Sequence, residues 1–95
     1  MNHSTRNLLI GVALAAIPTL ALAQSVPIIG LVELSGSGAT AGTGFNNGVK
    51  LAIREINAAG GLNGRPIAYS PYDTQTNPGV AKGLAQRAID EKSYV

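Results

Sequence analysis

The sequence predicts an α/β fold in which parallel strands alternate with helices. Three observations predict it: apolar stretches of strand length alternate with segments of helical periodicity, a glycine-rich loop follows the first apolar stretch, and strong turn signals separate the elements. The chain has 95 residues, which corresponds to at most one small domain. We therefore expect the order β-loop-α-β-loop-α, followed by the start of a third strand.

The N-terminal residues 1–23 have the composition of a secretory signal peptide. Arg6 lies in a polar start, a short apolar stretch follows, and Ala21 and Ala23 stand at its end. A charged start, a short apolar stretch and an A-x-A site are the three parts of such a signal. We expect cleavage after Ala23, a mature chain that begins at Gln24, and no stable membrane insertion after cleavage.

The first strand, the loop and the first helix follow in turn. Residues 26–34 are almost continuously apolar, which is typical of a strand covered on both faces. Residues 35–44 are small and glycine-rich and predict a loop, and residues 41–59 have helical periodicity, with Thr40 and Thr43 as candidate N-caps. We expect a buried face of Phe45, Val49, Ala52, Ile53 and Ile56, and a largely solvent-facing set of Asn46, Asn47, Lys50, Arg54 and Asn57.

The next segment predicts the end of this helix and a second strand. Gly60-Gly61 is a C-terminal stop signal, and Asn63-Gly64 is typical of a tight turn. Residues 66–72 then predict a strand. We expect Pro71 to limit pairing near its far end, because proline has no N–H to donate.

The last segment predicts a second helix. Asn77 and Pro78 are a strong start signal, an asparagine cap followed by proline at the first helical position. The buried stripe of this helix is expected to be Val80, Ala81, Leu84, Ala85 and Ala88. Residues 93–95 resemble the entry to a third strand, so alternation continues to the end of the sequence.

Composition excludes several classes of function. The 95 residues contain no cysteine and a single histidine, His3, which excludes disulfides, thiol chemistry and histidine-based metal sites or triads. The formal net charge is +2 with no cluster of lysine or arginine, so we expect no nucleic-acid partner. No serine, aspartate or glutamate has the partner that nucleophilic or acid–base catalysis needs. We expect neither an enzyme nor a cofactor.

The glycine-rich loop is the candidate ligand site. It joins the end of a strand to the start of a helix, where free N–H groups and the helix dipole favour an anionic group. Ligands of open α/β sheets bind at this edge, so Ser35, Gly36 and the residues that follow are expected near a ligand. Small residues that only permit a tight turn and close helix packing explain the same composition equally well.

A dinucleotide site is an alternative interpretation of the same loop. Gly38, Gly42 and Gly44 match the G-x-x-x-G-x-G spacing of short-chain dehydrogenases, and Asp73 would then stand for the ribose-binding acid. Glycine-rich loops match such spacings easily, and secreted compartments hold little free nicotinamide cofactor. A fragment of a nicotinamide-dependent dehydrogenase is therefore the less favoured alternative.

Three stretches together resemble one family. They are LSGSGATAG at 34–42, NGVKLAIREINAAGGLNGRPI at 47–67 and DTQTNPGVAKGLAQRAI at 73–89. These stretches are similar to the opening of the type I periplasmic binding proteins of branched-chain amino acid ABC transporters. That family folds as two α/β lobes joined by a hinge, which close on a small ligand. The resemblance implies that residues 24–95 are the N-terminal part of lobe I, a truncated and incomplete periplasmic-binding-protein-like fold.

The resemblance also implies a function and a site. The implied protein is the substrate-binding component of an ABC transporter; it captures a branched-chain amino acid or related solute in the periplasm, with an inner-membrane ABC permease as its partner. The residues implied to border the ligand cleft are Ser35, Gly36, Ser37, Gly38, Ala41 and Gly42. Asp73 is implied to brace the loop, and branched-chain amino acid binders often have an aromatic residue at the position of Ala41. An extracellular ligand-sensing receptor domain is the alternative.

Overall fold

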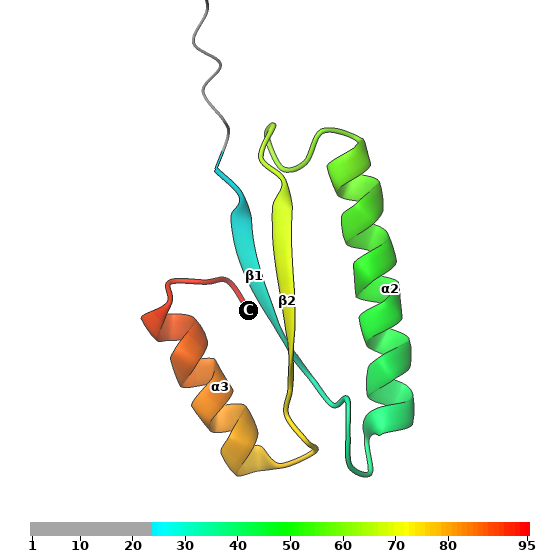
Figure 1. Cartoon of the computed structure of the whole chain (residues 1–95), viewed down its shortest axis with the longest axis vertical. Coiled ribbons are helices and arrows are strands. Elements are labelled where there is room, and N and C mark those ends of the chain that lie inside the picture. The colour runs from blue at the N-terminus through cyan, green and yellow to red at the C-terminus, as the bar shows by residue number, and fades with distance from the viewer. Residues whose placement is uncertain (1–23) are drawn as a thin grey trace, which may run out of the picture.

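The computed structural model of the protein describes residues 24–95, a two-stranded parallel sheet with two helices beside it (Figure 1). The elements are β1 (Val26–Val32), α2 (Ala39–Ala58), β2 (Ile67–Asp73) and α3 (Pro78–Asp90). The expected order of alternating strands and helices is confirmed. The signal peptide predicted for residues 1–23 lies outside the described residues.

The two strands are parallel, and each residue of β1 has a partner in β2 along the whole length of both strands. Val26 lies opposite Ile67 at one end, and Val32 lies opposite Asp73 at the other. β1 therefore ends two residues before the predicted boundary at Leu34, and β2 is displaced by one residue from the predicted range. Because both strands end at the same edge of the sheet, the loops that follow them meet there (Figure 1).

Pro71 does not limit the pairing of β2, contrary to the expectation from sequence. It lies inside the strand, opposite Gly30, and the backbone N–H of Thr74 still donates to the carbonyl of Val32 at 2.8 Å. Donors alternate in direction along a strand, so the nitrogen of Pro71 points away from β1. A proline at such a position removes no hydrogen bond of the ladder.

A third strand begins on the free edge of β1, as predicted for residues 93–95. Tyr94 forms a parallel bridge with Ile28. Its carbonyl accepts from the N–H of Ile29 at 2.8 Å, and its N–H donates to the carbonyl of Pro27 at 3.0 Å. β1 therefore lies between β2 and the segment at Tyr94, which is the position of a central strand.

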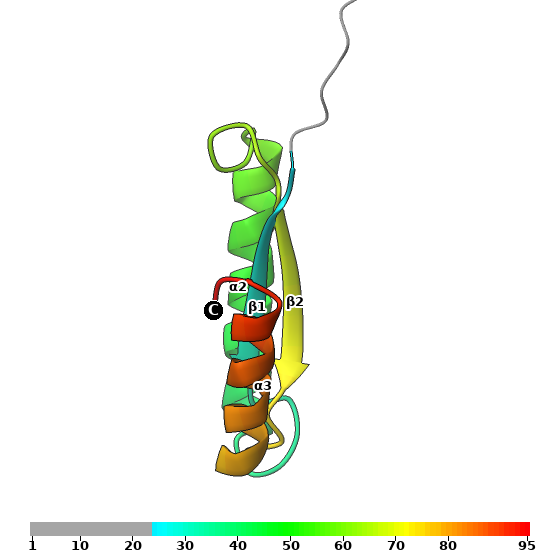
Figure 2. The ribbon, with the colours of Figure 1, turned by 90° about the vertical axis from the view of Figure 1, so that its left-hand side faces the viewer.

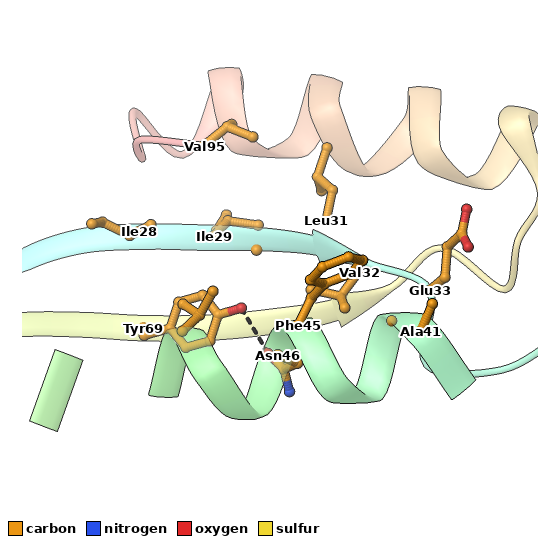
Figure 3. Close-up of a pocket in the computed structure, with 13 residues that line it drawn as sticks. Ile28, Ile29, Leu31, Val32, Glu33, Ala41, Phe45, Asn46, Tyr69 and Val95 are labelled. Carbon is orange, nitrogen blue, oxygen red and sulfur yellow. Dashed lines mark hydrogen bonds between the residues drawn. The ribbon is translucent and has the colours of Figure 1, made fainter. Parts of the chain in front are cut away.

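The helices cover different sides of the strands. α2 packs on both strands and α3 packs on β1, and Figure 2 shows α3 in front of the sheet. Figure 3 shows Leu31 directed toward α3, whereas Tyr69 and Asn46 meet on the α2 side. The ring of Tyr72 lies on the α3 side instead, with the guanidinium carbon of Arg87 4.5 Å from the ring centroid.

The prediction of which face of α2 is buried is wrong. Phe45 is 74% exposed, and Asn46, expected on the solvent-facing side, is buried. The Tyr69 hydroxyl donates to Oδ1 of Asn46 at 2.7 Å, while Asn57 bonds the N–H and the carbonyl of Ile67 at 2.8 and 3.0 Å. The side of α2 that meets β2 is thus partly polar, with hydrogen bonds from Asn46 and Asn57 to β2, which a hydrophobicity pattern does not detect.

The start of α2 also differs from the prediction. The helix begins at Ala39, its N-cap is Gly38, and no side chain caps the first turn. Thr40 and Thr43 lie inside the helix and are not caps. The N-cap position is set by the loop before the helix, because the N–H of Gly38 donates to the hydroxyl of Thr76 at 3.0 Å.

α3 begins as predicted. The side chain of Asn77 accepts hydrogen bonds from the N–H groups of Gly79 and Val80 at 2.8 and 3.2 Å, and Pro78 is the first helical residue. Ala88 of the predicted stripe is buried. The other four members of the stripe are half-buried.

The connection between α2 and β2 confirms both predicted signals. Gly60 and Gly61 have φ of 112° and 76°, values that favour glycine. Asn63-Gly64 forms a tight turn with φ of 51° and 79°. Leu62 and Arg65, on either side of the turn, exchange backbone hydrogen bonds of 2.8 and 3.0 Å.

The apolar core of the described residues is small. Its buried hydrophobic members are Val26, Ile29, Ile67 and Ala88. Large side chains remain exposed, among them Val49, Ile89 and Tyr94. Within residues 24–95 no helix combines the length and apolarity that a membrane crossing requires.

Candidate ligand-binding loop

The loop predicted to border a ligand lies at the carboxyl end of β1. Ser35, Gly36 and Ser37 are exposed, and Gly38 is half-buried at the start of α2. Ala41 is exposed on the first turn of the helix. The structure therefore brings these five predicted residues to one rim, at the edge where open parallel sheets bind ligands.

Asp73, the last residue of β2, braces this loop. Its Oδ1 accepts hydrogen bonds from the N–H groups of Leu34 at 3.0 Å, Ser35 at 3.1 Å and Gln75 at 2.8 Å. Its Oδ2 accepts from the Ser35 hydroxyl at 2.6 Å. These hydrogen bonds hold the pKa of Asp73 below its ordinary value. The bond from the Ser35 hydroxyl contributes most to this shift, and the bond from the N–H of Gln75 contributes next.

Thr76 makes a second connection to the same loop. Its hydroxyl accepts from the N–H of Gly38 at 3.0 Å and donates to the carbonyl of Ser35 at 2.8 Å. Both polar functions of the hydroxyl are thus used on the loop. Together, Asp73 and Thr76 fix both ends of the segment from Ser35 to Gly38.

Gly42, the sixth predicted site residue, is buried rather than exposed on the rim. A Cβ at this position would collide with the backbone carbonyl of Glu33. The absence of a side chain therefore allows α2 to approach the end of β1 closely. The structure gives Gly42 a packing role, which was the alternative interpretation of the small residues in this loop.

A groove of about 550 Å³ opens beside the loop, between β1 and α2 (Figure 3). Phe45 and Val49 of α2 and the residues of β1 from Ile28 onward make it largely apolar. Glu33 contributes the carboxylate of this lining, near Ala41 at the loop end of the groove (Figure 3).

The loop offers polar backbone but no metal ligands. The N–H groups of Thr40 and Ala41 in the first turn of α2 have no intrahelical acceptor and no side chain caps this turn, whereas the N–H of Ala39 donates to the carbonyl of Gly36 at 3.2 Å. Such groups suit the carboxylate of a small solute. Among residues 24–95, no group of three or more histidine, cysteine, aspartate or glutamate side chains could hold a metal ion.

Sequence reasoning did not identify two residues that shape the site. Thr76 acts on Gly38, which is 38 residues away, and no local pattern connects them. Glu33 was included in the first strand, yet it follows β1 and its side chain lies against Gly38. Both carboxylate oxygens of Asp73 already accept hydrogen bonds from the loop. This arrangement disfavours the alternative in which Asp73 binds the ribose of a dinucleotide.

Comparison with known families identifies the class of this protein. Residues 25–95 match the family described as periplasmic binding protein. The chain belongs to that family, as the resemblance in its sequence predicted.

Individual relatives share the same description. The chain is 29% identical over 91 residues to the Leu/Ile/Val-binding protein of Escherichia coli K12, which covers 96% of this chain and 25% of that protein. It is 36% identical over 80 residues to the Leu/Ile/Val-binding protein homolog 8 of Brucella suis, with coverage of 84% and 20%. The chain thus spans about a quarter or less of the length of these curated relatives.

Two solved structures share its fold. The branched-chain amino acid transporter substrate binding protein LivJ of Streptococcus pneumoniae, in complex with isoleucine, superposes with a TM-score of 0.71 at 32% identity, covering 74% of this chain and 20% of that one. A putative branched-chain amino acid ABC transporter protein of Silicibacter pomeroyi gives a TM-score of 0.69 at 39% identity, with coverage of 75% and 18%. The α/β fold predicted from sequence is therefore that of the matched part of these two proteins.

Proposed function

We propose that the whole natural protein to which residues 24–95 belong captures a branched-chain amino acid or a related small solute for import. The observation that carries this proposal is the braced loop at Ser35–Gly38, whose bonds to Asp73 and Thr76 hold the uncapped first turn of α2 at the carboxyl edge of a parallel sheet. The relatives named above, one of them in complex with isoleucine, support the choice of ligand class.

The proposed contacts follow from exposure. The residues that border the ligand are Ser35, Gly36, Ser37, Gly38 and Ala41. Gly42 does not border it but lets α2 pack closely against the end of β1. The N–H groups of the first turn of α2 suit the α-carboxylate of an amino acid.

The proposed organisation extends beyond the described residues. Residues 1–23 act as a cleaved signal peptide, and residues 24–95 form the N-terminal part of the first lobe of a binding protein. The protein then works in the periplasm and delivers its solute to an ABC permease in the inner membrane. It is a carrier with no catalytic step and no cofactor, so its ligand is released unchanged.

Calorimetry tests this proposal. The whole natural protein is titrated with L-isoleucine, L-leucine and L-valine, and with L-glutamate, whose side chain is charged rather than aliphatic, as the control. We expect saturable heat with at least one of the three aliphatic amino acids and none with glutamate. Absence of saturable heat with all three would overturn the proposed ligand class.

The same titration on residues 24–95 alone gives a second expectation. This part of the chain supplies one wall of a cleft, and binding sites for small molecules bury most of the ligand surface. We therefore expect no saturable heat from it. Micromolar binding by residues 24–95 alone would contradict a site that needs further walls.

A further inference from the structure

The segment that follows β2 reaches back to the loop that follows β1. Asp73 and Thr76 together make five hydrogen bonds to backbone or side-chain atoms of Leu34, Ser35 and Gly38. These bonds join residues that are 38 to 41 positions apart in the sequence. The loop conformation is therefore imposed from outside the loop.

The backbone of the reaching segment is itself in an unusual conformation. Gln75 and Thr76 have φ of 58° and 54°, the left-handed region that residues other than glycine rarely occupy. Two consecutive residues of this kind persist only where surrounding contacts hold them. Here the hydroxyl of Thr76 is held on both Ser35 and Gly38, and Thr76 N–H donates to the Thr74 hydroxyl at 3.3 Å.

The contacts also leave no room for a side chain at Gly36. A Cβ at Gly36, where φ is 80°, would lie 2.7 Å from the carbonyl of Gln75 and 2.9 Å from the hydroxyl oxygen of Thr76. The loop and the segment 75–76 are thus packed as well as hydrogen bonded. A loop held in one conformation loses less freedom when a ligand binds, which strengthens binding.

We propose that Asp73 and Thr76 are positioning residues that hold the loop 35–38 in its ligand-receiving conformation. This inference rests on the proposed function, because it assumes that the loop contacts the solute. Neither side chain needs to touch the ligand: Thr76 acts through Gly38 and Ser35, and Asp73 acts through Ser35 and Leu34.

The test uses matched variants of Thr76 in the whole natural protein. Thr76→Val keeps the shape of the side chain but neither accepts from Gly38 nor donates to Ser35. Thr76→Ser keeps the hydroxyl and should restore both. Thr43→Val, on the exposed surface of α2, controls for the loss of a threonine hydroxyl elsewhere. Thr76→Ala is the second loss variant if valine prevents folding.

Two readouts separate the positioning role from the proposed function. Amide hydrogen exchange at Gly38 reports the loop directly, and the Kd for L-isoleucine reports its consequence. In Thr76→Val we expect faster exchange at Gly38 and an affinity reduced by about fivefold or more, because two hydrogen bonds to the loop are lost and the net loss of one corresponds to about fivefold. Thr76→Ser and Thr43→Val should stay close to wild type in both readouts.

Asp73 provides an independent variant. Asp73→Asn keeps an oxygen that accepts from the three N–H groups, and its amide can donate to the Ser35 hydroxyl oxygen, so its affinity should remain close to wild type. Asp73→Ala removes every contact and should increase exchange at Leu34 and Ser35.

Each outcome decides the proposal. Unchanged exchange at Gly38 in Thr76→Val would overturn it, and so would faster exchange with an unchanged Kd, because the loop would then be irrelevant to the ligand. An equal loss in Thr43→Val would overturn it as well. Wild-type protein that binds no aliphatic amino acid would overturn the proposed function and the ligand role together, while exchange at Gly38 would still show whether Thr76 holds the loop.

Discussion

The two ends of the parallel sheet are closed by different kinds of contact. At the carboxyl end, the side chains of Asp73 and Thr76 bond a loop that is 38 to 41 residues away in sequence. At the other end, the backbone of the turn from α2 to β2 is closed by near neighbours: Leu62 and Arg65 exchange backbone hydrogen bonds, and Asn57 bonds the backbone ten residues further on. The long-range bonds at this end, from the Arg65 guanidinium to the carbonyls of Gln24 and Ser25, leave the turn by its side chain and do not shape its backbone.

Of the hydrogen bonds that shape the backbone at the two ends, only those at the carboxyl end require that the two strands are already paired. The contacts within the turn need only short loops to close, so they form locally. The contacts at the carboxyl end need β1 and β2 to be paired first, because only pairing brings Asp73 next to Leu34 and Ser35. A ligand loop supported in this way has the rigidity of the scaffold that carries it.

Gly42→Ala should have the largest effect on this comparison, because it overpacks the carboxyl end. The new Cβ would collide with the backbone carbonyl of Glu33. We expect the free energy of unfolding of the whole natural protein to fall by about 3 kcal/mol in urea denaturation. Gly48→Ala is the matched control on α2, has open space around it, and should be neutral or stabilise by up to about 1 kcal/mol. Equal effects of the two substitutions would contradict the close approach.

Asn57→Ala should destabilise the opposite end of the sheet, where β2 begins. It removes the acceptor for the N–H of Ile67 and the donor to its carbonyl, and it leaves a half-buried N–H without a partner. We expect a loss of about 2 kcal/mol in the free energy of unfolding. Asn47→Ala, at an exposed position of the same helix, should change it by less than about 0.5 kcal/mol. A similar loss for both asparagines would contradict a specific contribution from the contact with Ile67, because alanine has the higher helix propensity and does not itself destabilise a helix.

Gly64→Ala should have a smaller effect, confined to the turn. Nothing lies within 4 Å of the position that a Cβ would take, but φ is 79°. The cost is therefore conformational, about 1 kcal/mol, and is measurable as a lower midpoint of thermal unfolding. Amide exchange at Gly38 should stay unchanged. Faster exchange at Gly38 would mean that the two ends are coupled more closely than their contacts indicate.

Acid should loosen the carboxyl end selectively. The hydrogen bonds to Asp73 lower its pKa in the folded protein. A group with a lowered folded-state pKa contributes stability above its unfolded value of about 3.9, and that contribution is lost as the pH falls through the folded-state pKa. We expect protection of the Leu34 and Ser35 amides to fall below pH of about 4 relative to that of Arg65, when each is corrected for intrinsic exchange. Asp73→Asn should abolish this relative change, and a wild-type profile in that variant would assign the effect to another group.

The sequence was sufficient for features whose partners are near in the chain. Asn77-Pro78 and Asn63-Gly64 were predicted correctly because a cap and a tight turn are specified by adjacent residues. The alternation of strands and helices, and the start of a third strand at Tyr94, were also predicted, since each depends on a local apolar pattern.

The sequence was insufficient where burial depends on a distant partner. Asn46 was placed toward solvent because asparagine is polar, yet Tyr69 satisfies it 23 residues away. Gly38 was not expected as the helix N-cap, because its N–H bonds Thr76 on another segment. The bracing role of Asp73 came from a family resemblance, and its individual bonds emerged only once the two strands were paired.

The central claim is that the braced loop borders the ligand, and a crystal structure of the whole natural protein with L-isoleucine tests it most directly. We expect a polar atom of the amino acid within about 3.5 Å of a backbone N–H or hydroxyl between Ser35 and Ala41. We also expect Asp73 and Thr76 to keep their bonds to the loop. Isoleucine bound without any contact to residues 35–41 would contradict the account.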